Sequence, residues 1–197
     1  MIEGLQFSAG CDWTTPRVHH WQRWLGHLVG TPCVGLEVGV YEGRSSAWFL
    51  ENICTHPTSH LFAVDPWAAK SEANRGAIER SEHGRRYGFF ALEAERLFAT
   101  WLSHRTARFD FVYLDGAKEA AKELEHTVMI WPLLKPGGIL IWDDYQWQWT
   151  ASCKSPRPHL PPGPGIDAFL AAYAPEIEVI ARGWQVAVRK IDTAATT

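Results

Sequence analysis

The strongest constraint on the fold is the alternation of short apolar runs with helix-like segments along the chain. Four runs read as buried strands: "CVGLEVGV" at 33–40, "HLFAVD" at 60–65, "FDFVYLD" at 109–115 and "ILIWDD" at 139–144. Strands separated by helices are typical of βαβ units, whose strands lie parallel in one sheet. Two further strands close the chain about a tight turn at Arg182 and Gly183. The pattern predicts an α/β fold with a mostly parallel sheet, helices on both faces and a C-terminal antiparallel hairpin.

The segments between the strands carry helix signals. We expect helices at 14–30, 45–53, 68–83, 93–102, 117–131 and 166–174. Thr15 and either Ser45 or Ser46 are the candidate N-cap residues of the first two helices. Apolar residues three and four apart predict the core face of the fifth helix: Ala117, Ala121, Leu124, Val128 and Trp131.

Three segments are less regular. "YGFFAL" at 87–92 fits either a short strand or part of a longer helix. "LKPGG" at 134–138 predicts a turn. Residues 151–165 contain five prolines, which exclude regular structure and predict a long loop that could act as a lid.

The composition argues against several classes of protein. The 197 residues carry a net charge of −3, which gives no reason to expect nucleic acid or an anionic membrane as partner. No run approaches the roughly 18 apolar residues of a membrane span, and residues 1–10 lack the features of a signal peptide. The four cysteines show no zinc-type spacing. We expect one cytoplasmic domain over 1–197, with 1–31 as a helical lead-in.

Acidic residues follow three of the predicted strands. Asp65 ends the second run, Asp115 ends the third, and Asp143 and Asp144 end the fourth. The carboxyl ends of parallel strands meet at one edge of the sheet, which is where open α/β folds bind ligands. These four side chains therefore indicate a site.

The loop after the first strand reads E-x-G-x-x-x-G from Glu37 to Gly43. Gly39 and Gly43 would let the backbone turn tightly and approach a ligand, and the next helix offers N–H groups to an anion. The same segment also fits a strand–helix turn without a ligand. The G-x-G-x-x-G spacing of dinucleotide enzymes is absent, which argues against an NAD-type oxidoreductase. With Asp65 placed to hold a ribose, the loop favours a nucleoside-bearing cofactor without a pyrophosphate.

Five stretches together resemble a known family: "GLEVGVYEGRSSAWFLENI", "LFAVDPW", "FDFVYLDGAK", "WPLLKPGGILIWDDY" and "GWQVAVRK". They resemble the successive motifs of class I S-adenosylmethionine-dependent methyltransferases, and more narrowly a small bacterial group with D-G-[SA]-H and D-D-Y at its strand ends. The resemblance covers most of the chain and implies a Rossmann-like, seven-stranded sheet.

The resemblance also implies which residues contact S-adenosylmethionine. The loop from Glu37 to Gly43 would line its methionine end, and Asp65 would hold its ribose. The implied cofactor residues are Glu37, Gly39, Tyr41, Gly43, Ser45, Asp65, Pro66, Asp115 and Gly116. The resemblance does not assign the adenine contact between 67 and 108; Glu93 or a neighbour is the candidate.

The three acids Asp115, Asp143 and Asp144 suit a divalent metal, Mg²⁺ or else Mn²⁺ or Ca²⁺. The catechol and caffeoyl-CoA O-methyltransferases, which share the class I fold, have a similar pattern of one Asp, an Asp-Asn pair, and a Lys three residues past the first Asp. Lys118 stands three residues after Asp115, Asp144 takes the Asn position, and the bacterial group usually has His at the position of Lys118.

In this interpretation the metal lowers the pKa of an acceptor hydroxyl, and Lys118 or the region of His159 takes the proton. A metal-free enzyme with Asp143 as base is the alternative. Lys118 could equally be a solvated residue of the first helical turn.

Aromatic residues follow the paired acids. Tyr145, Trp147 and Trp149 could form the wall of a site for an aromatic or apolar acceptor. The expected partner is a small-molecule or peptide acceptor, methylated at oxygen, with a homodimer left open. A non-catalytic S-adenosylmethionine-binding protein is the remaining alternative.

Overall fold

The computed structural model describes residues 1–104, 108–149 and 159–192. Short 3₁₀ turns join several of its helices and strands. The helices and strands are α1 Val18–Leu25, β1 Val34–Val38, α2 Arg44–Asn52, β2 His60–Val64, α3 Ala68–Arg80, β3 Tyr87–Phe90, α4 Ala94–His104, β4 Phe109–Leu114, α5 Ala120–Ile130, β5 Leu134–Trp142, α6 Pro162–Ala172, β6 Ile177–Arg182 and β7 Val186–Lys190. Within the described ranges, no helix has the length and apolar character needed to cross a bilayer.

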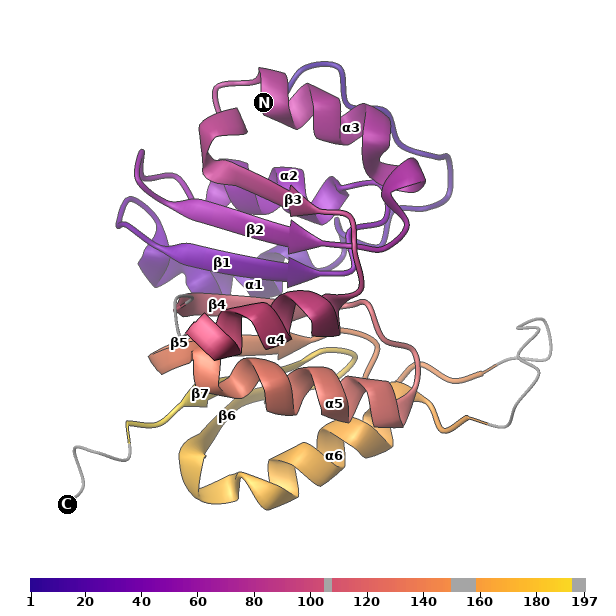
Figure 1. Ribbon diagram of the computed structural model, residues 1–197, viewed down its shortest axis with the longest axis vertical. Helices are drawn as coiled ribbons and strands as arrows, with labels where there is room; N and C mark the ends of the chain where they lie inside the picture. The colour runs from indigo at the N-terminus through magenta and orange to yellow at the C-terminus, as the bar shows by residue number, and fades with distance from the viewer. Residues whose placement is uncertain (105–107, 150–158, 193–197) are drawn as a thin grey trace.

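The strands form one seven-stranded sheet in the order β3-β2-β1-β4-β5-β7-β6 (Figure 1). Strands β1 to β5 pair in parallel, and β7 runs antiparallel between β5 and β6. The predicted Rossmann-like sheet with a C-terminal hairpin is confirmed. Because β6 extends to Arg182, the hairpin turn comprises 183–185 and not the predicted Arg182-Gly183 pair.

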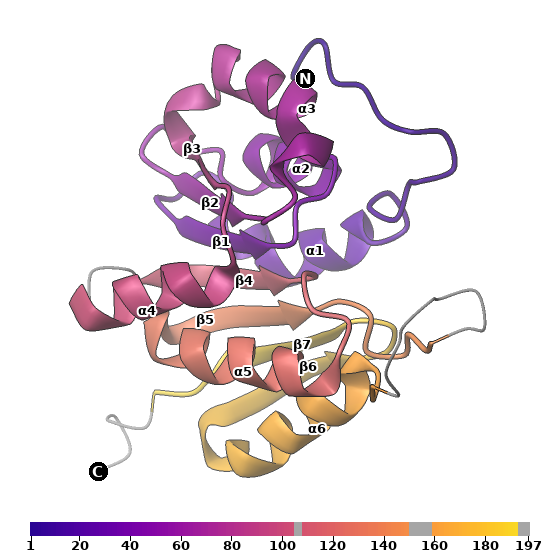
Figure 2. The same cartoon turned by 45° about the vertical axis from the view of Figure 1, so that its right-hand side comes forward.

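Helices cover both faces of the sheet, as Figure 2 shows. Helices α1, α2 and α3 bury Trp21, Phe49 and Ile78 on one face, and α4, α5 and α6 bury Phe98, Ile130 and others on the opposite face. The alternate residues of the central strands supply both cores, because successive side chains of a strand point to opposite faces.

Two predicted helix starts are wrong. Helix α1 begins at Val18, because Thr15 lies in the preceding turn, where its amide and hydroxyl groups donate to Asp12. Helix α2 begins after Gly43, whose positive φ of 77° ends the loop. Ser45 and Ser46 therefore lie inside the helix and do not cap it.

Two proline-containing segments are more regular than their composition predicts. Strand β5 includes "LKPGG", because Leu134 pairs with Phe109 and Ile139 with Phe111, so that the predicted turn is a wide bulge within the strand. Helix α6 starts at Pro162, since proline fits the first turn of a helix. Residues 151–158 of the predicted lid lie outside the described residues.

The remaining predictions concern the middle of the chain. "YGFFAL" contains a strand, β3. Helix α5 buries Glu123, His126 and Thr127, whereas Val128 of the predicted core face is 40% exposed. Periodicity misplaced this face because polar side chains of the helix are buried in the core, where Thr127 accepts the indole N–H of Trp142 at 2.8 Å.

Candidate active site at the carboxyl edge of the sheet

The strand order reverses between β1 and β4, and the strand-end acids gather around this point. Asp115 donates its backbone N–H to Val38 O at 2.8 Å, and Asp143 donates to Leu114 O at 2.9 Å. On the other side of β1, the amide of Asp65 bonds to Phe90 O at 3.1 Å. The sheet thus aligns the three acids along one edge, as the strand pattern predicts.

Gly39 is the point of closest approach between the first loop and β4. Its φ is +87°, and a Cβ atom there would lie 2.6 Å from the backbone nitrogen of Gly116 and 2.7 Å from the carbonyl carbon of Asp115. Only glycine fits this crossing.

Asp65 holds the first loop from the side. Its Oδ2 accepts the backbone N–H groups of Val40 and Tyr41 at 2.8 and 2.9 Å, and its Oδ1 accepts that of Trp67 at 2.7 Å. Tyr41 has a φ of +50°, and among the described residues only Asp144 is another non-glycine with positive φ. Both lie in strand-end loops at this edge, and such backbone strain is typical of functional sites.

Glu37 lies beneath the loop and is fully buried. Its carboxyl group accepts hydrogen bonds from the hydroxyls of Ser45 and Ser46, which tie β1 to α2. Burial raises the pKa of Glu37 to about 8. The side chain thus holds the start of α2 against β1 and so fixes the loop between them.

Lys118 lies between two of the predicted metal ligands. Its Nζ is 2.7 Å from Asp115 Oδ1, 2.5 Å from Asp144 Oδ2 and 3.0 Å from the carbonyl oxygen of Asp115. Although burial opposes the charge, Asp115 and Asp144 raise the pKa of Lys118 above its ordinary value. The ammonium group is therefore charged at neutral pH.

The third acid, Asp143, bonds to a residue that the sequence reading missed. The hydroxyl of Tyr113 donates to Asp143 Oδ2 at 2.5 Å and lies 3.3 Å from Asp115 Oδ2. The other oxygen of Asp143 accepts the amide of Asp144 at 2.7 Å. Tyr113 lies two residues before Asp115 on the same strand face, so the period-two pattern could have identified it.

Glu123 is a second residue that the sequence reading missed. This side chain of α5 is 2% exposed, and its Oε1 has no hydrogen-bond partner among the residues that the structure describes. Burial raises the pKa of Glu123 well above its ordinary range, and although Lys118 opposes this, Asp115 and Asp144 add to it. An acid among apolar helix positions gave no signal in the sequence pattern.

The predicted metal site is not confirmed. Across the described residues, no three acids, histidines or cysteines are arranged to hold a metal ion. The physical reason is that Asp115 and Asp144 face Lys118, while Asp143 faces Tyr113. The three carboxylates therefore do not converge on one point.

The structure does not bring every predicted site residue to this cluster. The hydroxyl of Tyr145 bonds to Arg182 at 2.5 Å and Asp167 at 3.1 Å, between β6 and α6. His159 pairs with Glu119 at 3.2 Å.

Trp147 follows the paired acids in the chain, and its backbone N–H donates to the carbonyl oxygen of Asp144 at 2.9 Å. Its ring contacts that of Trp149 with centroids 4.7 Å apart, so these two aromatic residues form one group.

A small cavity of about 40 Å³ lies beside Asp115. Its lining includes Tyr41 of the first loop, Ser45 of α2, and Trp13 and Thr14 of the N-terminal segment. Figure 2 shows this segment running past α3 and down to α1 along the edge to which the strands point. The N-terminal segment therefore covers the candidate site.

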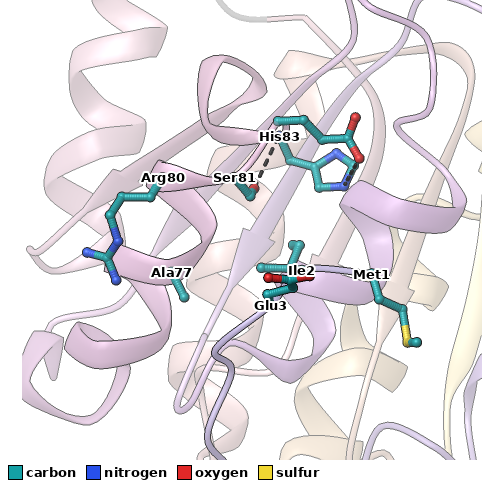
Figure 3. Close-up of a pocket in the computed structure, with 8 residues that line it drawn as sticks. Met1, Ile2, Glu3, Ala77, Arg80, Ser81 and His83 are labelled. Atoms are coloured by element: carbon teal, nitrogen blue, oxygen red, sulfur yellow. Dashed lines mark hydrogen bonds and ion pairs between the residues drawn. The ribbon is translucent and has the colours of Figure 1, made fainter.

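A larger hollow of about 390 Å³ lies elsewhere, between residues 1–3 and the end of α3 (Figure 3). Its side chains include Ala77, Arg80 and His83. Since α3 leaves the carboxyl edge after β2 and returns to the start of β3, this hollow lies at the opposite edge. It shares no residue with the candidate site.

A family model described as a methyltransferase domain matches residues 36–145, more than half of the chain. The chain belongs to this methyltransferase family. The match spans β1 to the loop after β5 and so includes Gly39, Asp65, Asp115 and Asp143. No match was found among curated proteins.

Solved structures of methyltransferases share the fold. An O-methyltransferase from Bacillus cereus in complex with SAH has a TM-score of 0.66 and 17% identity, over 96% of this chain and 84% of that one. The O-methyltransferase TomG from Streptomyces achromogenes, involved in tomaymycin synthesis and in complex with SAM, gives 0.67 and 17%, over 95% and 82%. The SAH-bound methyltransferase PaMTH1 of Podospora anserina gives 0.61 and 21%, over 82% and 73%.

Proposed function

We propose that this methyltransferase uses S-adenosylmethionine and methylates an oxygen atom of a small-molecule or peptide acceptor. The observation that carries the proposal is the crossing of the Gly39 loop over Gly116 beside three strand-end acids. The Bacillus cereus and TomG neighbours are O-methyltransferases that hold SAH and SAM, which supports both the cofactor and the methylated atom.

The residues around the first loop fit this cofactor. Helix α2 begins after Gly43, and no side chain of the described residues caps it, so its first N–H groups suit the carboxylate of a methionine moiety. Asp65, held at the loop, suits a ribose, because a carboxylate can accept further bonds from hydroxyls. When bound, S-adenosylmethionine supplies an electrophilic methyl group on a positively charged sulfur.

Trp67 is a further cofactor residue in this proposal. It follows Asp65 and Pro66 at the same edge and is 72% exposed, which is unusual for so large an apolar ring. A planar adenine ring would cover it by stacking. The sequence reading passed over this residue because Asp-Pro-Trp also fits an ordinary turn.

Asp115 is the better placed base for an acceptor hydroxyl. It lines the small cavity, and burial, opposed by Lys118 but aided by Asp143 and Asp144, raises its pKa to about 7. A base works best when its pKa is near the working pH. Lys118 remains charged, and the Tyr113 hydroxyl binds Asp143 Oδ2 closely, at 2.5 Å, but Asp115 Oδ2 only loosely, at 3.3 Å.

The acceptor class follows from the base and its surroundings. A carboxylate removes a proton more readily from a phenol, with a pKa of about 10, than from an aliphatic alcohol. Trp147 and Trp149 offer an aromatic surface directly after Asp144. We therefore propose an acceptor with an aromatic hydroxyl.

Isothermal titration with S-adenosylmethionine tests the proposed cofactor. The full chain should bind with a Kd of roughly 1–100 µM, in the range of ordinary enzyme substrates. Trp67→Ala should weaken binding about tenfold, or about 1.4 kcal/mol. Trp184→Ala, at the hairpin turn, is the matched control and should bind like the wild type. An absence of binding heat by a folded wild-type protein would overturn the proposal.

A further inference from the structure

The ammonium group of Lys118 fills the point between two carboxylates that the sequence reading assigned to a metal. It has three N–H donors, and three oxygens lie within 3.0 Å of it: Asp115 Oδ1, Asp144 Oδ2 and the carbonyl of Asp115. All of its donor capacity is therefore used inside the site. Two carboxylates and a carbonyl oxygen thus bind the ammonium, although the side chain is 37% exposed.

Tyr113 removes the third carboxylate from that point. Its hydroxyl donates to Asp143 Oδ2 at 2.5 Å, and its ring packs in the core against Trp21 and Phe49, with centroids 5.1 and 5.6 Å apart. Because the ring is buried on both sides, the hydroxyl cannot swing away without disturbing the core. Asp143 is thus directed to Tyr113.

A divalent metal would need free carboxylate oxygens that converge on one point, together with water. A lysine alone does not exclude a metal, because the metal-dependent enzymes carry one at the same position; here Asp144 stands at the Asn position and binds the ammonium at 2.5 Å. We infer that Lys118 is the resident cation of the site and, with Tyr113 holding Asp143, takes the place of the divalent metal of metal-dependent O-methyltransferases. The inference concerns the chemistry of the proposed methyl-transfer site and so rests on the proposed function.

The inference predicts that a variant without the Lys118 ammonium group gains affinity for a divalent metal ion. Removing the ammonium leaves Asp115 and Asp144 without their cation, with Asp143 adjacent to Asp144. Such a group of acids attracts hard divalent ions. Lys118→Met removes the charge and keeps most of the side-chain volume, and Lys118→Arg keeps the charge.

The experiment measures binding of Mn²⁺ to the full chain by electron paramagnetic resonance. Lys118→Met should bind Mn²⁺ at least tenfold more tightly than the wild type, and Lys118→Arg should not. Lys118→Met with Asp115→Asn should lose the gain, which places the new site among these acids. Micromolar Mn²⁺ binding by the wild type that Asp115→Asn abolishes would overturn the inference, as would no gain in a folded Lys118→Met.

Titration of S-adenosylmethionine into the wild type with Mg²⁺ and with EDTA separates this inference from the proposed function. The inference expects the same affinity in both solutions. A tenfold dependence on Mg²⁺ would overturn it while leaving the cofactor proposal intact. Direct titration of Mn²⁺ into the wild type needs no Lys118 variant, so it decides the question even where Lys118→Met fails to fold.

Discussion

At the scale of single residues, the tightest constraint falls on Gly39. A Cβ atom at this position would lie within 2.7 Å of backbone atoms of Asp115 and Gly116. The residue also has a positive φ, which costs a non-glycine residue about 1–2 kcal/mol. Two separate effects therefore oppose any side chain there.

Gly39→Ala should lower the free energy of unfolding by about 2–4 kcal/mol, the sum of backbone strain and overpacking. Gly30→Ala is the matched control, because Gly30 has a similar φ of +75° but nothing within 4 Å of its Cβ position. The control should lose only about 1–2 kcal/mol. Urea denaturation measures both, and equal losses would show that the crossing is not crowded.

Glu37 makes stability depend on pH. Its folded-state pKa is raised to about 8 by burial, from an unfolded value near 4.3. Between these two pH values the folded state keeps a proton that the unfolded state has lost. The free energy of unfolding therefore falls as the pH rises through this range.

Glu37→Gln should remove this dependence, because the amide stays neutral. Between pH 5 and pH 7 the free energy of unfolding of the wild type should fall by about 2–3 kcal/mol relative to that of the variant. Urea denaturation at several pH values is the measurement. Glu82→Gln, on a side chain that is 84% exposed, is the control and should follow the wild type. If the difference in unfolding free energy between Glu37→Gln and the wild type stays constant with pH, the raised pKa of Glu37 is wrong.

The residues of the site were predictable where chain order alone decides their position. Asp65, Asp115 and Asp143 end strands, and the ends of parallel strands must meet. Tyr113 and Glu123 were missed because their role depends on where a hydroxyl or a buried carboxyl points. The direction of Lys118, between Asp115 and Asp144, likewise depends on side-chain packing.

At the scale of elements, strands and helices were predictable and their ends were not. Long apolar runs form buried strands wherever they pair, so β1, β2 and β4 lie close to where the sequence reading placed them. Helix ends depend on competition between local hydrogen bonds. Thr15 bonds to Asp12, and Ser45 and Ser46 bond to Glu37, which removes these residues from capping.

The contact between α5 and α6 is an element-scale feature that one glycine controls. A Cβ atom on Gly165 would lie 2.1 Å from the carbonyl oxygen of Ala120. The amide of Ala120 also bonds to Leu160 O at 2.9 Å, so the start of α5 is held on both sides. Helix α6 can therefore pack this closely against the start of α5 only because residue 165 is a glycine.

Gly165→Ala should destabilise the fold by about 1–3 kcal/mol, because the two helices must separate. In the middle of an uncrowded helix the same change stabilises, by about 0.5–1 kcal/mol. Gly76→Ala in α3 is the control, since its Cβ position meets only the flexible end of Arg80. Thermal unfolding of both variants is the measurement. A stable Gly165→Ala variant would contradict the proposed packing.

At the scale of the whole molecule, the N-terminal segment joins the two edges of the sheet. The amide of Ile2 bonds to Glu51 at the end of α2, and Gln6 and Ser8 bond to Asn74 and Glu42. Farther along, the segment crosses the candidate site. The cavity of about 40 Å³ that it leaves is far smaller than the roughly 300 Å³ of ordinary ligand sites.

We therefore expect a cofactor of the proposed size to enter this cavity by displacing the N-terminal segment. The segment is held over the site by the pair of Asp12 with Arg44 at 3.6 Å and by the contact of the Trp13 ring with the Tyr41 ring. Trp13 is 62% exposed, so its loss should weaken the closed arrangement without opening a core cavity.

Trp13→Ala should bind S-adenosylmethionine faster, because more molecules are open at any moment, and release it faster still, because the cover is weaker. Both rate constants should rise about threefold or more, as expected when binding depends on a minor open state. Stopped-flow tryptophan fluorescence measures them, and His27→Ala, an exposed change outside the site, should leave both unchanged. Unchanged rates in a folded Trp13→Ala variant would mean that the segment is a fixed wall and the cofactor enters elsewhere.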